Sequence, residues 1–121
     1  MSNNRLQSES QEFRGLKLIP LVIRYAAGVP SVIANPMNEA VALTDVGTGE
    51  VTITLSSASL APLMAWVQVR PTDPNTLSLE ANIDGATTTT AVTIVVNSGA
   101  DGATETDPVD LHVLLVKLEI N

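Results

Sequence analysis

The sequence predicts an all-β protein folded as an antiparallel sandwich, and three observations support this prediction. Hydrophobic residues make up 45% of the 121 residues, yet Phe, Trp and Tyr occur once each, so the core must consist of Val, Leu, Ile and Ala. The β-branched members of that set favour strands. Runs of these residues alternate with Gly-, Pro-, Asn- and Asp-rich turns about every ten residues, as in sandwiches and barrels. Several runs also alternate apolar and polar side chains, which is the period of a strand with one buried face.

A chain of this length is expected to form one domain. Residues 1–13 are rich in Ser, Asn, Gln and Glu without any period, and we interpret them as a polar N-terminal arm. Residues 14–121 are then a single sandwich domain. The arm lacks the apolar core of a secretory signal, so synthesis in the cytoplasm is expected. The apolar stretch 16–34 is interrupted by charged residues and prolines, so no membrane association is expected.

In chain order, we expect strands at residues 16–25, 39–44, 50–56, 62–70, 76–83, 89–97 and 109–119. The second and third of these form a hairpin in the sequence AVALTDVGTGEVTITL, residues 40–55. Gly47 and Gly49 can supply the positive φ angles that a short hairpin loop needs. In the third strand the apolar residues alternate with Thr52 and Thr54, which indicates one buried face and one exposed face.

Two strands have more apolar surface than a sandwich core can bury. The last run, VDLHVLLVKLEI, is apolar on both faces, which predicts an internal strand. In PLMAWVQVR the residues of one face are all apolar and fit a core. The opposite face carries Met64, Trp66, Gln68 and Arg70. A lone Trp beside Met and Arg is typical of interfaces, although a loop of the same chain could also cover it. Because a sandwich covers only one face of each sheet, we expect another copy of the chain to cover the second, with Met64 and Trp66 in the subunit interface.

The charge distribution divides the chain in two. The net charge of −7 argues against a nucleic-acid-binding protein, which needs clustered Lys and Arg. Residues 1–24 nevertheless contain four of the six cations and carry a net +2, whereas residues 25–121 carry −9. A basic arm that docks on an acidic neighbour would explain this difference. The alternative is chance in a short solvated arm.

Side chains with catalytic or metal-binding chemistry are sparse. Without Cys there is no disulfide, thiolate nucleophile or Cys-ligated zinc. Asp110 and His112 share one face of a strand, which is half of a general-base unit, but no nucleophile motif accompanies them, and a structural histidine is the preferred interpretation. The acidic segment SGADGATETDPVD does not have the spacing of an EF-hand, and a solvated turn is preferred to a calcium site. The sequence therefore predicts a protein that is not an enzyme and binds no cofactor or metal.

Four stretches carry a resemblance to a known class of proteins: the hairpin A-V-x-L-T-x-x-G-T-G-x-V-T-I-T-L at 40–55, and residues 62–69, 87–96 and 107–116. In their order and patterning they resemble the capsid decoration (cement) proteins and head-fibre modules of tailed bacteriophages. The resemblance implies a jelly-roll-like sandwich that forms a homotrimer. It also implies a place on the outer capsid surface of the virion after synthesis in the host cytoplasm.

The resemblance further implies a role without catalysis, in which the oligomer binds the major capsid protein and stabilises the junctions between coat subunits. An extended terminal arm often makes that contact, and we place Arg5, Arg14 and Lys17 in it. Two alternatives share the sandwich. One is a trimeric phage fibre or receptor-binding module, although the chain has few aromatics for a receptor-binding tip. The other is a cupin-type enzyme, which a single histidine argues against.

Overall fold

The computed structural model describes residues 15–26, 29–47, 49–71, 79–98 and 109–119. These residues form eight strands and no helix, which confirms the all-β prediction. The strands are β1 (Leu16–Ala26), β2 (Val29–Ala34), β3 (Val41–Gly47), β4 (Glu50–Leu55), β5 (Met64–Pro71), β6 (Leu79–Ile83), β7 (Ala91–Ser98) and β8 (Val109–Leu118).

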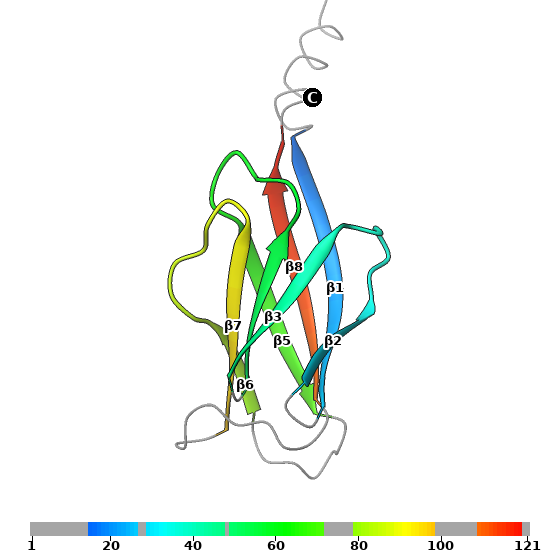
Figure 1. Ribbon diagram of the computed structural model, residues 1–121, viewed down its shortest axis with the longest axis vertical. Helices are drawn as coiled ribbons and strands as arrows, with labels where there is room; N and C mark the ends of the chain where they lie inside the picture. Colours follow the sequence, from blue (N-terminus) through cyan, green and yellow to red (C-terminus); the bar gives the residue numbers. More distant parts are fainter. Residues whose placement is uncertain (1–14, 27–28, 48, 72–78, 99–108, 120–121) are drawn as a thin grey trace, which may run out of the picture.

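The strands pair into two four-stranded antiparallel sheets that pack face to face (Figure 1). Sheet A has the order β2-β1-β8-β5, and sheet B has the order β3-β4-β7-β6. β1 and β8 run side by side along the molecule, from the pair Leu16–Leu118 to the pair Tyr25–Val109 (Figure 1). The two ends of the described chain therefore lie together. β8 lies between β1 and β5, which confirms that the last strand is internal.

The core between the sheets is aliphatic, as the composition predicts. β1 contributes alternate residues from Ile19 to Tyr25, and β8 contributes alternate residues from Leu111 to Leu115; β4, β7 and Leu63 supply the remainder. Tyr25 is the one aromatic side chain in this cluster. Burying an aliphatic side chain of this size stabilises the fold by roughly 1.5–3 kcal/mol, so this cluster is the main source of stability.

The strand order does not confirm the jelly-roll wrapping that the resemblance implies. In a jelly roll most consecutive strands alternate between the two sheets, whereas β1–β2, β3–β4 and β6–β7 are each consecutive strands within one sheet. The order β3-β4-β7-β6 corresponds to strands A-B-E-D of an immunoglobulin-type sandwich, and β5-β8 corresponds to C-F. β1 then lies beside β8, in the place of strand G. The N-terminal strand thus completes a sheet made of later segments.

β2 is absent from the sequence-based prediction, which treats this region as a turn because of Gly28, Pro30 and Asn35-Pro36. Proline cannot donate a hydrogen bond to a sheet and is tolerated mainly on edge strands. β2 is such an edge strand and pairs only with β1. Pro30 therefore limits where the strand can lie without preventing it from forming.

The hairpin of β3 and β4 is confirmed, with pairing from Val41–Leu55 to Gly47–Glu50. The prediction for its glycines is correct at only one position. Gly49 has a φ of 68°, which other residues rarely adopt, whereas Gly47 still belongs to β3 and is not among the positive-φ residues. β3 is therefore longer than predicted, and the turn is tighter.

Tyr25 links the two sheets at this turn. Its side chain is fully buried, and its hydroxyl oxygen lies 2.6 Å from the carbonyl oxygen of Gly47 and 2.9 Å from Oδ1 of Asp45. Because Tyr25 belongs to sheet A and both acceptors belong to β3 of sheet B, the phenol joins the sheets through a polar contact at the end of an apolar core.

Candidate interaction surface

Exposed apolar side chains gather on sheet A. Among the described residues, ten large hydrophobic side chains are exposed, and seven of them belong to strands of sheet A. These seven are Leu16, Leu18, Val29, Val32, Ile33, Met64 and Trp66. Only Val46 belongs to a strand of sheet B. The two outer faces of the sandwich are therefore chemically different.

Strand register builds an apolar surface on the outside of sheet A. Residues directly opposite each other on neighbouring strands share a face of the sheet. Val116 of β8 pairs with Leu18 of β1 and Met64 of β5, and the next row along the strands is Pro20, Leu114 and Trp66. We call the surface formed by these two rows together with Leu16 the sheet A face.

The side chains of the sheet A face are exposed to solvent except at its centre. The side chain of Trp66 is 59% exposed and that of Met64 is 50% exposed, whereas Val116, flanked by Leu18 and Met64, is only 5% exposed. No described loop of the chain lies over Trp66 to bury it. The exposure of Met64 and Trp66 matches what a subunit interface requires, and the prediction of the interface itself stays a prediction.

The other end of the same outer face is polar. Its rows are Val22, His112 and Gln68, followed by Arg24, Asp110 and Arg70. The Arg24 guanidinium donates from Nε and Nη2 to the two carboxylate oxygens of Asp110 at 2.8 and 3.0 Å. This hydrogen bonding lowers the pKa of Asp110, with a smaller contribution in the same direction from the charge of Arg70. Both oxygens of Asp110 accept from Arg24, and the side chain of His112, two residues along β8, is exposed.

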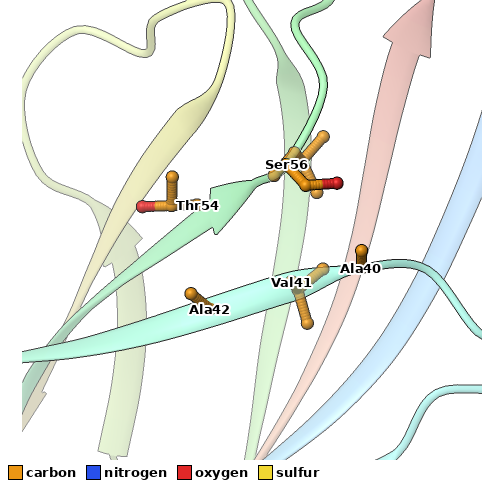
Figure 2. A pocket seen from close by; sticks show the side chains of 6 residues that line it. Ala40, Val41, Ala42, Thr54 and Ser56 are labelled. Atoms are coloured by element: carbon orange, nitrogen blue, oxygen red, sulfur yellow. The ribbon is translucent and has the colours of Figure 1, made fainter.

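The outer face of sheet B carries small hydroxyl and methyl groups. Thr52 and Thr93 are paired across β4 and β7, and their hydroxyl oxygens lie 2.7 Å apart. An open hollow of about 220 Å³ lies beside the same sheet and is lined by Ala40, Val41, Ala42, Thr54, Leu55 and Ser56; Figure 2 shows how these side chains lie. None of these six side chains is ionisable, so the hollow offers no group for acid–base or metal chemistry.

β2 lies at the margin of sheet A (Figure 1) and carries a second apolar surface. We define the β2 edge by its exposed apolar side chains, which are Val29, Val32 and Ile33 in the strand and Met37 in the turn that follows. The Asn35 side chain holds this turn: its Nδ2 donates to the Glu39 carbonyl at 2.8 Å, and its Oδ1 accepts from the Glu39 amide at 3.0 Å. Met37 is therefore presented on an ordered turn.

Two further pairs of polar groups lie outside the Arg24–Asp110 row. Glu50 and Asp84 share a hydrogen bond that raises the pKa of Glu50, because one carboxyl must keep its proton. The buried Lys117 Nζ lies 2.5 Å from the Ser57 hydroxyl and 3.4 Å from Oε2 of Glu119, and this contact holds the end of β8. In the described part of the chain no three His, Asp or Glu residues are grouped as a metal site.

Of the three residues predicted to contact the capsid, Arg5 and Arg14 lie outside the described residues, as does most of the acidic segment 98–110. Lys17 lies near the start of β1, and its Nζ is 2.7 Å from Oε2 of Glu39, a hydrogen bond that raises the pKa of Lys17. The search for a membrane-spanning helix among the described residues finds none. No protein-family model, curated protein or solved structure matches the chain.

The sequence predicts half of the sheet A face. Met64 and Trp66 stand out, and the second apolar face of the last strand indicates a need for cover. Leu16 and Leu18 are not predicted, although they alternate with the core residues of the same strand. The β2 edge is not predicted either, and its signal in the sequence is the uncharged stretch of residues 29–38.

Proposed function

We propose that this protein is a non-enzymatic structural component of a phage virion: a capsid decoration protein that binds the outer capsid surface as an oligomer and stabilises the junctions between coat subunits. The observation that carries the proposal is the exposed sheet A face. Monomeric soluble proteins rarely expose contiguous apolar patches of this kind, and such patches mark interaction sites. A protein whose main feature is an uncovered sheet face is suited to assembly.

The arrangement of the remaining surface agrees with a structural role. The hollow beside sheet B is lined by alkyl and hydroxyl groups alone, and the Asp110 carboxylate is bonded to Arg24 rather than to His112. The capsid is proposed as the binding partner because the hairpin and the last strand resemble those of phage capsid decoration proteins. A decoration protein acts by burying area at several coat junctions, which raises the cost of opening the shell.

The oligomer that we propose is a homotrimer with Met64 and Trp66 between subunits. Three copies would present three arms from one body, and linked binding sites act at a high effective concentration, so that weak contacts release slowly. We propose that each arm, with Arg5 and Arg14, contacts an acidic part of the major capsid protein. Lys17 would mark the point where the arm joins the sandwich, since its ion pair with Glu39 fixes it to the body.

The test measures the mass of the purified full-length protein by light scattering and then its binding to capsids stripped of their decoration. We expect a mass of three chains and saturable rebinding. A variant that lacks residues 1–13 should stay folded and trimeric but lose capsid binding. A stable monomer that ignores capsids would contradict the proposal, and unchanged binding of the truncated variant would contradict the role of the arm.

A further inference from the structure

We infer that the copies of this chain assemble head to tail, with the β2 edge of one copy packed on the sheet A face of the next. This inference rests on the oligomer of the proposed function and names the two surfaces that meet. It does not depend on the capsid. Four observations carry it: the composition of the β2 edge, the direction in which Val32 points, the shape of the two surfaces, and the order of the turn that holds Met37.

The β2 edge lacks the charges that usually protect an edge strand. Exposed edges present unpaired backbone groups, and natural proteins protect them with charged side chains, proline or a covering segment. No residue from 29 to 38 is charged. Pro30 and the irregular register at Ile33 are the protecting features of this strand, and Val29 beside Pro30 is among the exposed hydrophobic side chains. The apolar side chains of this edge are open to a partner.

The β2 edge cannot be covered by a partner that lies flat on the outside of sheet A. Val32 is paired with Ile23, which points into the core and is fully buried, so Val32 faces the same side of the sheet. It is nevertheless 36% exposed, because β2 and β3 are not hydrogen-bonded to each other and the sandwich is open along this side. A partner must approach from the edge to reach Val32. Val29 is paired with Ala26, which neighbours the buried Tyr25, so Val29 faces the outside of sheet A. β2 pairs with residues 22–26 of β1, whereas the sheet A face uses residues 16–20 of that strand, so the two surfaces are separate.

Two different surfaces on one chain favour a heterologous contact. In a two-fold dimer each copy uses the same patch, so pairing through the sheet A face would leave the β2 edge exposed. A head-to-tail contact covers both surfaces in every copy, and it closes into a ring when the rotation allows. A ring of three matches the proposed homotrimer.

The shapes and charges of the two surfaces fit this arrangement. The sheet A face spans three paired strands, about 14 Å across, and runs about 13 Å along β1 from Leu16 to Pro20, so it can receive a narrow edge. Its two apolar rows carry no charge, and the row of Arg24, Asp110 and Arg70 lies at the far end. An uncharged edge can pack on the apolar rows while these charged groups stay in water at the rim.

The β2 edge is also held ready for binding. Besides the Asn35 side-chain bonds, the Asn38 amide donates to the Asn35 carbonyl at 2.9 Å, and Asn38 has a φ of 51° that asparagine tolerates well. The turn that carries Met37 is thus ordered within one copy. A preformed surface loses little conformational freedom on association.

The test uses two variants with substitutions at exposed positions and then mixes them. Trp66→Glu should disable the sheet A face, and Ile33→Glu should disable the β2 edge. We expect each purified variant to be a monomer by light scattering. In an equal mixture, the intact edge of the Trp66 variant can still bind the intact face of the Ile33 variant, so we expect complexes of two chains, one of each kind.

The controls separate assembly from folding and from capsid binding. Val46→Glu, at an exposed position of β3 in sheet B, should leave the oligomer mass unchanged. Leu18→Glu and Met37→Glu repeat the test at other positions of the face and the edge, should either first variant fail to fold by circular dichroism. If Trp66→Glu dissociates the oligomer but Ile33→Glu and Met37→Glu do not, a two-fold contact is indicated and the inference is wrong. Since no capsid is present, an assembly that forms as described but ignores capsids would overturn the proposed function alone.

Discussion

Tyr25 is the residue through which a polar group reaches into the aliphatic core. Its hydroxyl contacts Gly47 and Asp45 across the gap between the sheets, and the ring fills space next to the last pairs of β1 and β8. The sequence shows a single Tyr at the end of a long apolar strand, but it does not show that the hydroxyl meets a hairpin twenty residues later. That contact depends on how the two sheets are stacked.

Tyr25→Phe tests this contact because it removes the hydroxyl and keeps the ring. The change leaves the Gly47 carbonyl without this donor, and we expect the free energy of unfolding to fall by about 1–2 kcal/mol. Urea unfolding followed by circular dichroism measures it. In a double-mutant cycle with Asp45→Ala, the two losses should be less than additive, since both substitutions remove the contact between the Tyr25 hydroxyl and Asp45, whereas only Tyr25→Phe removes the contact with Gly47. Additive losses would place the stabilising effect elsewhere.

Asp110 gives stability a dependence on pH. Its pKa is lowered in the folded protein by hydrogen bonds from Arg24, so its contribution is present above the ordinary Asp pKa and is lost as the pH falls through the lowered value. We expect Asp110→Asn to lower the free energy of unfolding by about 0.5–1 kcal/mol at pH 7, as is usual for partly exposed ion pairs. The difference from wild type should shrink below about pH 4.

Glu80→Gln is the matched control for this pH dependence. It removes the same charge from an exposed position on β6, away from Arg24. Unfolding curves recorded between pH 2 and 7 should show the narrowing difference for Asp110→Asn and not for Glu80→Gln. A constant difference across this range would mean that the Arg24 pair does not stabilise the fold through its charge.

At the scale of elements, the hairpin of β3 and β4 depends on one glycine rather than two. Gly49 has a positive φ, and a side chain there is strained, so Gly49→Ala should destabilise the protein by about 1–2 kcal/mol. Gly47→Ala is the control two residues away, because an added Cβ at Gly47 meets nothing within 4 Å. Thermal unfolding of the two variants measures the difference. Equal losses would contradict this assignment of the turn.

The sequence predicts the elements of this protein better than their arrangement. Period-two alternation locates β4, and apolar runs bounded by turn residues locate β1, β7 and β8. The order of strands follows instead from long-range pairing, and no local pattern indicates that β1 should complete the sheet of β5 and β8. β2 is not predicted, for a related reason. Its sequence contains Pro30 and resembles a turn, and only the complete sheet shows that these residues form an edge strand.

The residues of the sheet A face can likewise be predicted only in part from the sequence. Met64 and Trp66 stand out in the sequence because their strand has a clear core face, and an exposed Trp beside it is unusual. Leu16 and Leu18 do not stand out, since apolar residues at the start of a long apolar run look like core. Their exposure becomes evident only when the register with Leu118 and Val116 places them on the outside of sheet A.

At the scale of the whole molecule, the sandwich is asymmetric. The outside of sheet B carries paired threonines such as Thr52 and Thr93 and can face water, whereas the outside of sheet A combines an apolar half with a charged end. An antiparallel sheet usually covers one face and solvates the other. Sheet A departs from this rule, and the departure is what makes the protein a component of an assembly in our proposal.

Hydrogen exchange can detect the cover over the β2 edge in the assembled protein. The amides of an edge strand exchange through local opening, and a partner packed against the strand makes that opening less frequent. We expect the β2 amides to exchange more slowly in the wild-type oligomer than in the Trp66→Glu monomer, measured by mass spectrometry at equal pH and temperature. β3, the edge of sheet B on the same side of the sandwich, should exchange at the same rate in both proteins. Because the substitution lies on β5 and not on β2, slower exchange of β2 in the oligomer would report contact between copies, and equal exchange would mean that the face of one copy does not cover the edge of another.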